Sequence, residues 1–187
     1  VDPMNEGNAA IKSFQQDLQL TFPMAECPTA WSNTFGIQGY PCAAVNRNGA
    51  NAIFRNEWPS VATAQLAQTA EVNVGGQVVL NPVTRQATIT VEAYYTADSK
   101  ESTNYLTVVM LQDSILGSQS GASSNPAQVV NGQYCHMHIL RDIITPTWGD
   151  QIAPTTAGSL ITKQYVYDIP EVIGSPNGVE VDLDNLI

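Results

Sequence analysis

Residues 87–95 alternate between apolar and polar side chains, and this pattern constrains the fold more than any other. The odd positions from Ala87 to Ala93 are apolar, and the even positions from Thr88 to Glu92 are polar. Side chains of a β-strand point alternately to opposite faces, so the segment predicts a strand that buries one face and exposes the other. Such half-buried strands are typical of antiparallel sheets.

From residue 70 onward the chain continues as strands and turns, with no predicted helix. Gly75-Gly76 is expected to separate two short strands, at 72–74 and 77–80. Four further strands are predicted, at 105–111, 134–140, 160–169 and 179–183. Strands at this spacing predict an antiparallel β-sandwich over residues 70–187. We expect its core to include Ile89, Val91, Leu106, Val108, Met137 and Ile139.

The first 69 residues have a different pattern. Ile11, Phe14 and Leu18 predict an amphipathic helix over 5–20. A short helix is expected over 29–35, and a hairpin over 43–55 turning at Asn48-Gly49. A second full helix is predicted over 58–69, with inward-facing residues Val61, Ala62 and Leu66. The chain therefore divides into an α+β part, 1–69, and a β part, 70–187.

The charge of the chain excludes one class of partner. Seventeen acidic and seven basic side chains give a formal net charge of −10. Nucleic acid and anionic membrane surfaces repel such a protein, so neither is an expected partner. No run approaches the roughly 18 consecutive apolar residues of a membrane span. No phosphate-binding loop, catalytic triad or paired carboxylates stand out, and we expect no cofactor.

His136 and His138 lie two residues apart in a predicted strand, which places both imidazoles on one face. Such a pair is half of many metal sites, and a ligand-binding role is one reading. No third ligand is evident, so the pattern favours structural histidines without a bound metal.

Three cysteines, Cys27, Cys42 and Cys135, are far apart in the sequence. Cys27 and Cys42 allow either a disulfide or two buried thiols. None of the three has a resolving cysteine two residues away, which disfavours a catalytic thiol.

Trp148, in a Trp-Gly-Asp turn, is either a rim residue of the sandwich or a stacking platform for a ligand. Arg47 and Arg141 are scarce cations in an acidic chain, and we expect both to be ion-paired.

The run Phe35 to Arg47 resembles the loop and strand that carry the cis-proline of thioredoxin-like folds. Tyr40, Pro41 and Cys42 fill the cis-proline loop, with Pro41 as that proline. The chain has no Cys-x-x-Cys pair, so the redox chemistry of such folds is not encoded here.

Three segments in order are similar to the Omp28 family of Bacteroidetes cell-envelope proteins, many of them predicted lipoproteins. They are Gly39 to Arg47, Leu106 to Gly117, and His136-Met-His-Ile-Leu-Arg141 followed by Trp148-Gly-Asp. The resemblance covers most of residues 35–165. It implies a partial thioredoxin-like domain at 1–69 and an immunoglobulin-like β-sandwich at 70–187.

The same resemblance implies outer-membrane attachment through a lipidated cysteine upstream of Val1, and a non-enzymatic binding or adhesion role. A protein or glycan partner would meet loops such as 97–104 and 117–132. The alternative is a thiol-disulfide or peroxide-handling protein whose redox cysteines lie upstream. Because the first βαβ portion of the thioredoxin-like domain is missing, we expect upstream residues, a second copy or a complementing chain to cover the hairpin.

Overall fold

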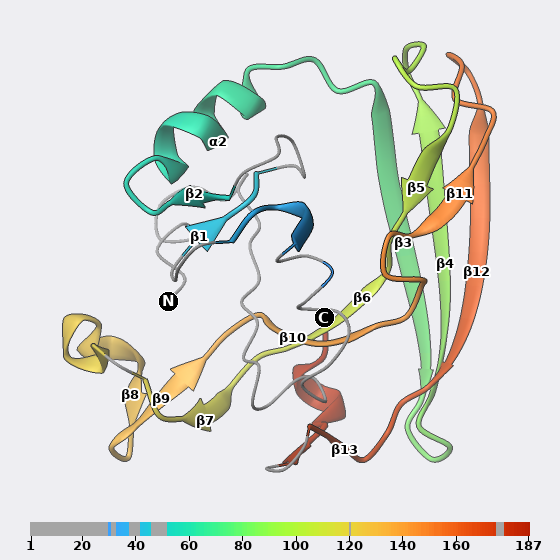
Figure 1. The fold of residues 1–187 in the computed structure, drawn as a ribbon. Helices are drawn as coiled ribbons and strands as arrows, with labels where there is room; N and C mark the ends of the chain where they lie inside the picture. Colours follow the sequence, from blue (N-terminus) through green and yellow to red (C-terminus); the bar gives the residue numbers. More distant parts are fainter. Residues whose placement is uncertain (1–29, 31–32, 38–41, 46–51, 120, 175–177) are drawn as a thin grey trace. The chain divides into compact units, whose positions relative to one another are not determined.

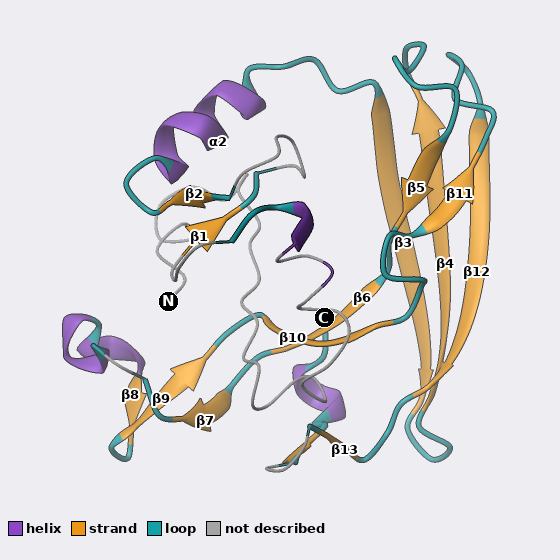
Figure 2. Cartoon of the chain, in the orientation of Figure 1, coloured by secondary structure: helices purple, strands orange, loops and turns teal. Residues whose placement is uncertain are grey.

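A computed structural model describes the chain except for residues 1–29, 31–32, 38–41, 46–51, 120 and 175–177 (Figure 1). The described residues form mostly antiparallel strands, with a nine-residue α-helix, α2 (Trp58–Leu66) (Figure 2). The chain forms two compact units, one of residues 1–65, 110–142 and 172–187 and one of residues 66–109 and 143–171. Compact units of this kind need not coincide with domains, so the division at residue 69 stays a prediction.

The second unit is built around β4 (Gln86–Tyr95), which is paired along both of its edges (Figure 1). β3 (Val72–Asn81) pairs with it on one side and β12 (Leu160–Asp168) on the other, both antiparallel. The strand predicted from the alternation at 87–95 is confirmed. Its two neighbours are nearly as long, so the three strands form one extended sheet.

A second layer packs on one face of this sheet. β5 (Asn104–Leu106) and β11 (Asp150–Ile152) pair antiparallel. Ile152 is buried in one cluster with Ala93 and Tyr95 of β4, and Leu106 packs against that cluster. Two antiparallel layers with a shared core are consistent with the predicted β-sandwich.

The buried residues of β4 are the odd ones, as the alternation requires: Ala87, Ile89, Val91, Ala93 and Tyr95. Of the six core residues predicted from the sequence, Ile89, Val91 and Ile139 are buried. The other three are half-buried: Leu106, Val108 and Met137. Both predicted residues of the central strand β4 are buried, whereas Val108 and Met137 lie outside the strands.

Four strand predictions need correction. The strand predicted at 134–140 is interrupted at residues 137–138, and the one predicted at 179–183 ends at residue 180. β3 runs without interruption from Val72 to Asn81 through Gly75-Gly76, which were expected to form a turn. Both glycines keep ordinary strand pairing, opposite Glu92 and Val91 of β4. The predicted strand 105–111 divides into β5 and β6 (Val109–Gln112), since each half pairs with a different partner, β11 and β10 (Ile139–Ile143).

The first unit holds the remaining strands. Three short strands pair antiparallel in the order β7-β9-β8, and two pair near the C-terminus. Their bounds are β7 (Ile115–Gly117), β8 (Val129–Val130), β9 (Gln133–His136), β13 (Val172–Ile173) and β14 (Val179–Glu180), with 3-10 turns at η1 (Ala122–Ser124), η2 (Pro126–Gln128) and η3 (Leu183–Asn185).

The predicted hairpin near residue 48 is present as β1 (Cys42–Ala43) paired antiparallel with β2 (Ile53–Phe54). Its turn, Asn48-Gly49, and the predicted helix over 5–20 lie outside the described residues. Within the predicted helix 29–35, the described residues Ala30, Asn33 and Thr34 are helical.

The predicted second helix is α2, with Pro59 in its first turn, where proline is tolerated. Of its expected inward residues, Ala62 is buried, whereas Val61 and Leu66 are exposed. Trp58 is buried instead, and its indole Nε1 donates a hydrogen bond to the Ile53 carbonyl of β2 at 3.0 Å. The helix is therefore anchored by its first residue.

We expect Ile89→Asp to lower the free energy of unfolding by about 3–5 kcal/mol, because it leaves an uncompensated charge in the core. Ile89 is 8 % exposed and lies opposite the uncharged residues Tyr165 and Val78, while Lys163 lies opposite Val91 rather than Ile89. Urea unfolding followed by circular dichroism measures the change. The matched control is Val166→Asp, at a position 62 % exposed, which should cost less than 1 kcal/mol, as surface changes do. Equal losses in both variants would contradict the assignment of the two sheet faces.

Candidate functional site

Among the described residues of the first unit, Arg141 of β10 is the most fully buried charged side chain, at 1 % exposure. Its Nη1 donates to Oε1 of Gln112 at 2.8 Å, and its Nη2 donates to the Val179 carbonyl at 2.8 Å. Longer bonds of 3.4 Å reach the carbonyls of Glu180 and Ile173. The guanidinium thus ties β6 and β10 to the C-terminal strands.

The expected ion pair of Arg141 is not found in the described part of the chain. Its hydrogen bonds go to neutral carbonyl and amide oxygens instead. Burial lowers the pKa of Arg141 from its ordinary value, but an arginine keeps its charge in proteins. The group therefore serves as a structural clamp. Arg47 lies outside the described residues.

His136 and His138 do not lie on one strand face as predicted. β9 ends at His136, and His138 sits in a bend with a positive φ of 54° before β10 begins. The backbone N–H of His138 donates to Oδ1 of Asp113 at 2.6 Å, which holds this bend. The period-2 argument fails here because a left-handed residue interrupts the strand.

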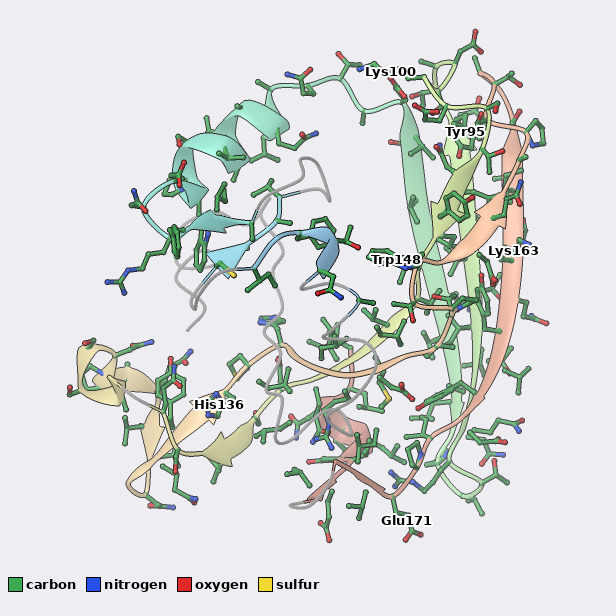
Figure 3. All side chains as sticks on the ribbon, viewed as in Figure 1. Tyr95, Lys100, His136, Trp148, Lys163 and Glu171 are labelled. Carbon is green, nitrogen blue, oxygen red and sulfur yellow. The ribbon has the colours of Figure 1, made fainter. Side chains whose placement is uncertain are left out.

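His136 lies inside the first unit, at 4 % exposure (Figure 3). Its ring stands edge to face against Tyr134, with centroids 5.1 Å apart. A Cβ added to Gly117 would meet the imidazole Nε2 at 3.4 Å, so Gly117 leaves room for this ring. Among the described residues, no three His, Cys, Asp or Glu side chains gather closely enough to hold a metal ion.

Trp148 is presented by a tight turn of the second unit (Figure 3). It is 42 % exposed, and the following residue, Gly149, has a φ of 93°. The Gly149 N–H donates to the Pro146 carbonyl at 2.7 Å, and a Cβ at Gly149 would lie 2.7 Å from the Leu106 carbonyl oxygen. Only glycine fits both the φ and the space, so the position of Trp148 is held by its neighbour.

Tyr165 of β12 faces the second layer of the same unit. Its hydroxyl is buried without a hydrogen bond of standard geometry, near the Asp150 carboxylate of β11. Burial first, and then the negative charge of Asp150, raise the pKa of Tyr165 to about 12. No sequence pattern distinguished this tyrosine, because the pairing of distant strands creates its surroundings.

The cis-proline loop is described only in part. Tyr40 and Pro41 lie outside the described residues, so the cis bond expected at Pro41 stays a prediction. Cys42, in β1, is a half-buried free cysteine, as is Cys135 in β9. Burial raises the pKa of the Cys42 thiol, which disfavours the reactive thiolate. Cys27 also lies outside the described residues.

We expect Arg141→Lys to destabilise the first unit by about 3 kcal/mol, because one ammonium cannot reach all the acceptors that the guanidinium serves. The control is Arg85→Lys. Arg85 donates to the carbonyls of Ile169 and Pro170 but is only half-buried, so water can replace its bonds at a cost near 1 kcal/mol. Urea unfolding gives both values. A smaller loss for Arg141→Lys than for Arg85→Lys would contradict the clamp.

The Tyr165 phenol makes stability pH-dependent in the alkaline range. Its pKa is near 10 when unfolded and about 12 when folded, so the folded state holds the proton more tightly between these values. Stability should therefore fall as pH rises from 10 to 12, and Tyr165→Phe should reduce that fall. Melting temperatures between pH 8 and 12 measure it, with Tyr94→Phe, 47 % exposed, as the control. If the melting temperature of Tyr165→Phe falls with pH as steeply as that of the parent, Tyr165 is not the group responsible.

Comparison with known proteins gives one finding. The family model "Outer membrane protein Omp28" matches residues 28–181, a span that holds all three segments from which the resemblance was drawn. No curated protein and no solved structure matches the chain. Within the described residues, the helices are too short and too polar to cross a membrane. The family match places the protein in the cell envelope, associated with the outer membrane, and the chain belongs to the Omp28 family of outer membrane proteins.

Proposed function

We propose that this chain is a non-enzymatic cell-envelope protein that binds a protein or a glycan surface, in a binding or adhesion role. One observation carries the proposal: the second unit exposes many large apolar side chains on its strands and turns. They are Val74, Val78, Val79, Val83, Tyr94, Tyr105, Trp148, Leu160 and Val166. They lie on both faces of the sheet and on its turns, and large apolar side chains exposed in such number are typical of proteins that bind partners.

Trp148 is the best candidate for an anchor within this set. Aromatic side chains supply most of the binding energy at many interfaces, and a ring held in place loses little entropy on binding. The turn at Gly149 supplies that fixed position. Tyr105 of β5, in the same unit, is 59 % exposed and offers a second aromatic surface.

The loop 97–104 is also held in one conformation. The Asp98 carboxylate accepts a bond from the Ala157 N–H, and Thr155 Oγ1 donates to the Glu101 carbonyl at 2.7 Å. At its end, Asn104 Nδ2 donates to the Tyr95 hydroxyl at 2.9 Å. Charged residues such as Lys100 remain exposed on it (Figure 3). A rigid polar loop of this kind supports recognition of a partner.

The finer points of the family resemblance belong to the same proposal. A thioredoxin-like origin for residues 1–69 is supported by the hairpin of β1 and β2 followed by α2. An immunoglobulin-like origin for the β part is supported by the two antiparallel layers around β4. His136 is too buried to meet a large partner without rearrangement, whereas His138 is half-buried.

The proposal is tested by binding of the chain to immobilised purified polysaccharides and extracellular glycoproteins, measured by biolayer interferometry. We expect saturable binding to at least one probe, with Trp148→Ala weakening it tenfold or more. Val130→Ala, a change at a position 43 % exposed in β8 of the first unit, should bind like the parent.

Mass spectrometry of each probe after incubation separates binding from catalysis. An unchanged probe is the expected result. Chemical conversion of a probe, or binding that is equally strong in Trp148→Ala and the parent, would overturn the proposal.

A further inference from the structure

We infer that β3 is a docking edge for a second copy of this chain, which adds its own β3 antiparallel to form one sheet across two protomers. This inference goes beyond the proposed function and does not depend on it. β3 is ten residues long and pairs with β4 along one edge. In the part of the chain that the structure describes, no strand pairs with its other edge, at the end of the order β12-β4-β3 (Figure 1).

The two outer strands of this sheet differ in their protection. Natural edge strands commonly carry charged residues, inward-pointing ones in particular, which prevent pairing with other chains. β12 has such a residue in Lys163, which lies opposite the buried Val91 and therefore on the inner face. β3 has no charged residue from Val72 to Asn81. Among the described residues both outer strands lack a partner on their outer edge, but only β3 also lacks a charged residue to block pairing.

Gly75 and Gly76 give independent support. Neither has a positive φ, and a Cβ at Gly75 would meet nothing within 4 Å, while one at Gly76 would meet only the Thr90 carbonyl at 3.8 Å. Nothing described within the chain therefore requires glycine at these positions. Glycine weakens a strand, and in mid-strand it often marks the close approach of another backbone.

The inner face of β3 is self-complementary about Gly76. In order along the strand this face carries Val72, Val74, Gly76, Val78 and Leu80. If Gly76 lies opposite Gly76 of a second copy, Val74 faces Val78 and Val72 faces Leu80, so each pair is apolar. A twofold axis through Gly76 gives this register, and about eight to ten backbone hydrogen bonds would join the two strands.

The absence of charge on β3 favours a second copy over a basic partner, because the strand has no carboxylate to attract cations. Two chains of formal net charge −10 repel each other, but salt screens this repulsion beyond about 8 Å, and β3 adds no like charges at the contact. Val74 and Val78 are 62 % and 61 % exposed, and pairing across the twofold axis would bring them into contact with each other.

The first test is analytical ultracentrifugation of the chain between about 1 and 200 μM. We expect a reversible dimer that goes no further, because each copy has one open β3 edge. Val78→Lys should raise the dissociation constant at least tenfold. The control is Val166→Lys on β12, where the valine is 62 % exposed, close to the exposure of Val78. This variant should leave the dissociation constant of the dimer unchanged.

The second test fixes the register. Under mild oxidation, Gly76→Cys should give a covalent dimer, because its two copies lie directly opposite each other. Gln77→Cys should not cross-link above the parent, because its two copies lie diagonally. A chain that stays monomeric, equal effects of Val78→Lys and Val166→Lys, open-ended oligomers, or cross-linking favoured at residue 77 would each overturn the inference.

Discussion

β4 is the element on which the second unit depends, because both of its edges are paired and one of its faces is buried. The register with β3 and β12 fixes which residues of those strands face the core. A shift of one residue would send Ile89 and Val91 to the exposed face and Thr88 and Thr90 to the core. The second layer of β5 and β11 then has a single apolar surface on which to pack, with Tyr95 at 0 % exposure under it. The places of Trp148 and the loop 97–104 follow from that packing.

The first unit relies on a buried cation rather than on a long strand. The strands described in it are between two and five residues long, too short to bury a large apolar face. Arg141 compensates by donating to carbonyls of the C-terminal segment and to Gln112 of β6. The backbone bonds between Leu111 and Ile187, both 3.0 Å, hold the same segment from the other side. Removing the buried guanidinium from its acceptors would leave an uncompensated charge, so Arg141 favours this arrangement of the C-terminal segment over others.

The fold could be predicted from sequence where a local pattern and the tertiary partner agree. The alternation at 87–95 is long and is paired on both sides, so β4 was predicted almost to the residue. Gly75-Gly76 favours a turn locally, but the strand continues through it because β3 pairs with β4 over ten residues. At 134–140 one continuous strand was predicted, but His138 takes a left-handed conformation, and its N–H donates to the Asp113 carboxylate. Nothing in the local sequence encodes that contact.

The candidate site was harder to predict than the fold, for a related reason. Trp148 could be named as an exposed aromatic because Trp-Gly-Asp is a turn signal within the sequence itself. The surroundings of Arg141 and Tyr165 depend on residues more than ten positions away in the chain, which composition and spacing do not reveal. We expected an ion pair for Arg141 because cations are scarce in this acidic chain. Backbone carbonyl groups can accept the same hydrogen bonds, however, and any sequence supplies them.

The exposed apolar residues and the open edge of β3 raise the same physical question, which is how an acidic protein keeps such surfaces from aggregating. A net charge of −10 gives long-range repulsion between copies, but screening at physiological salt confines it to about 8 Å. At contact distance only local features decide the outcome, so Lys163 prevents pairing at β12 while the uncharged β3 allows it. A twofold pairing uses up the open edge in one step and leaves β12 as the outer strand of both copies. Association then stops at two, and Trp148 and Tyr105 stay available, since neither belongs to β3.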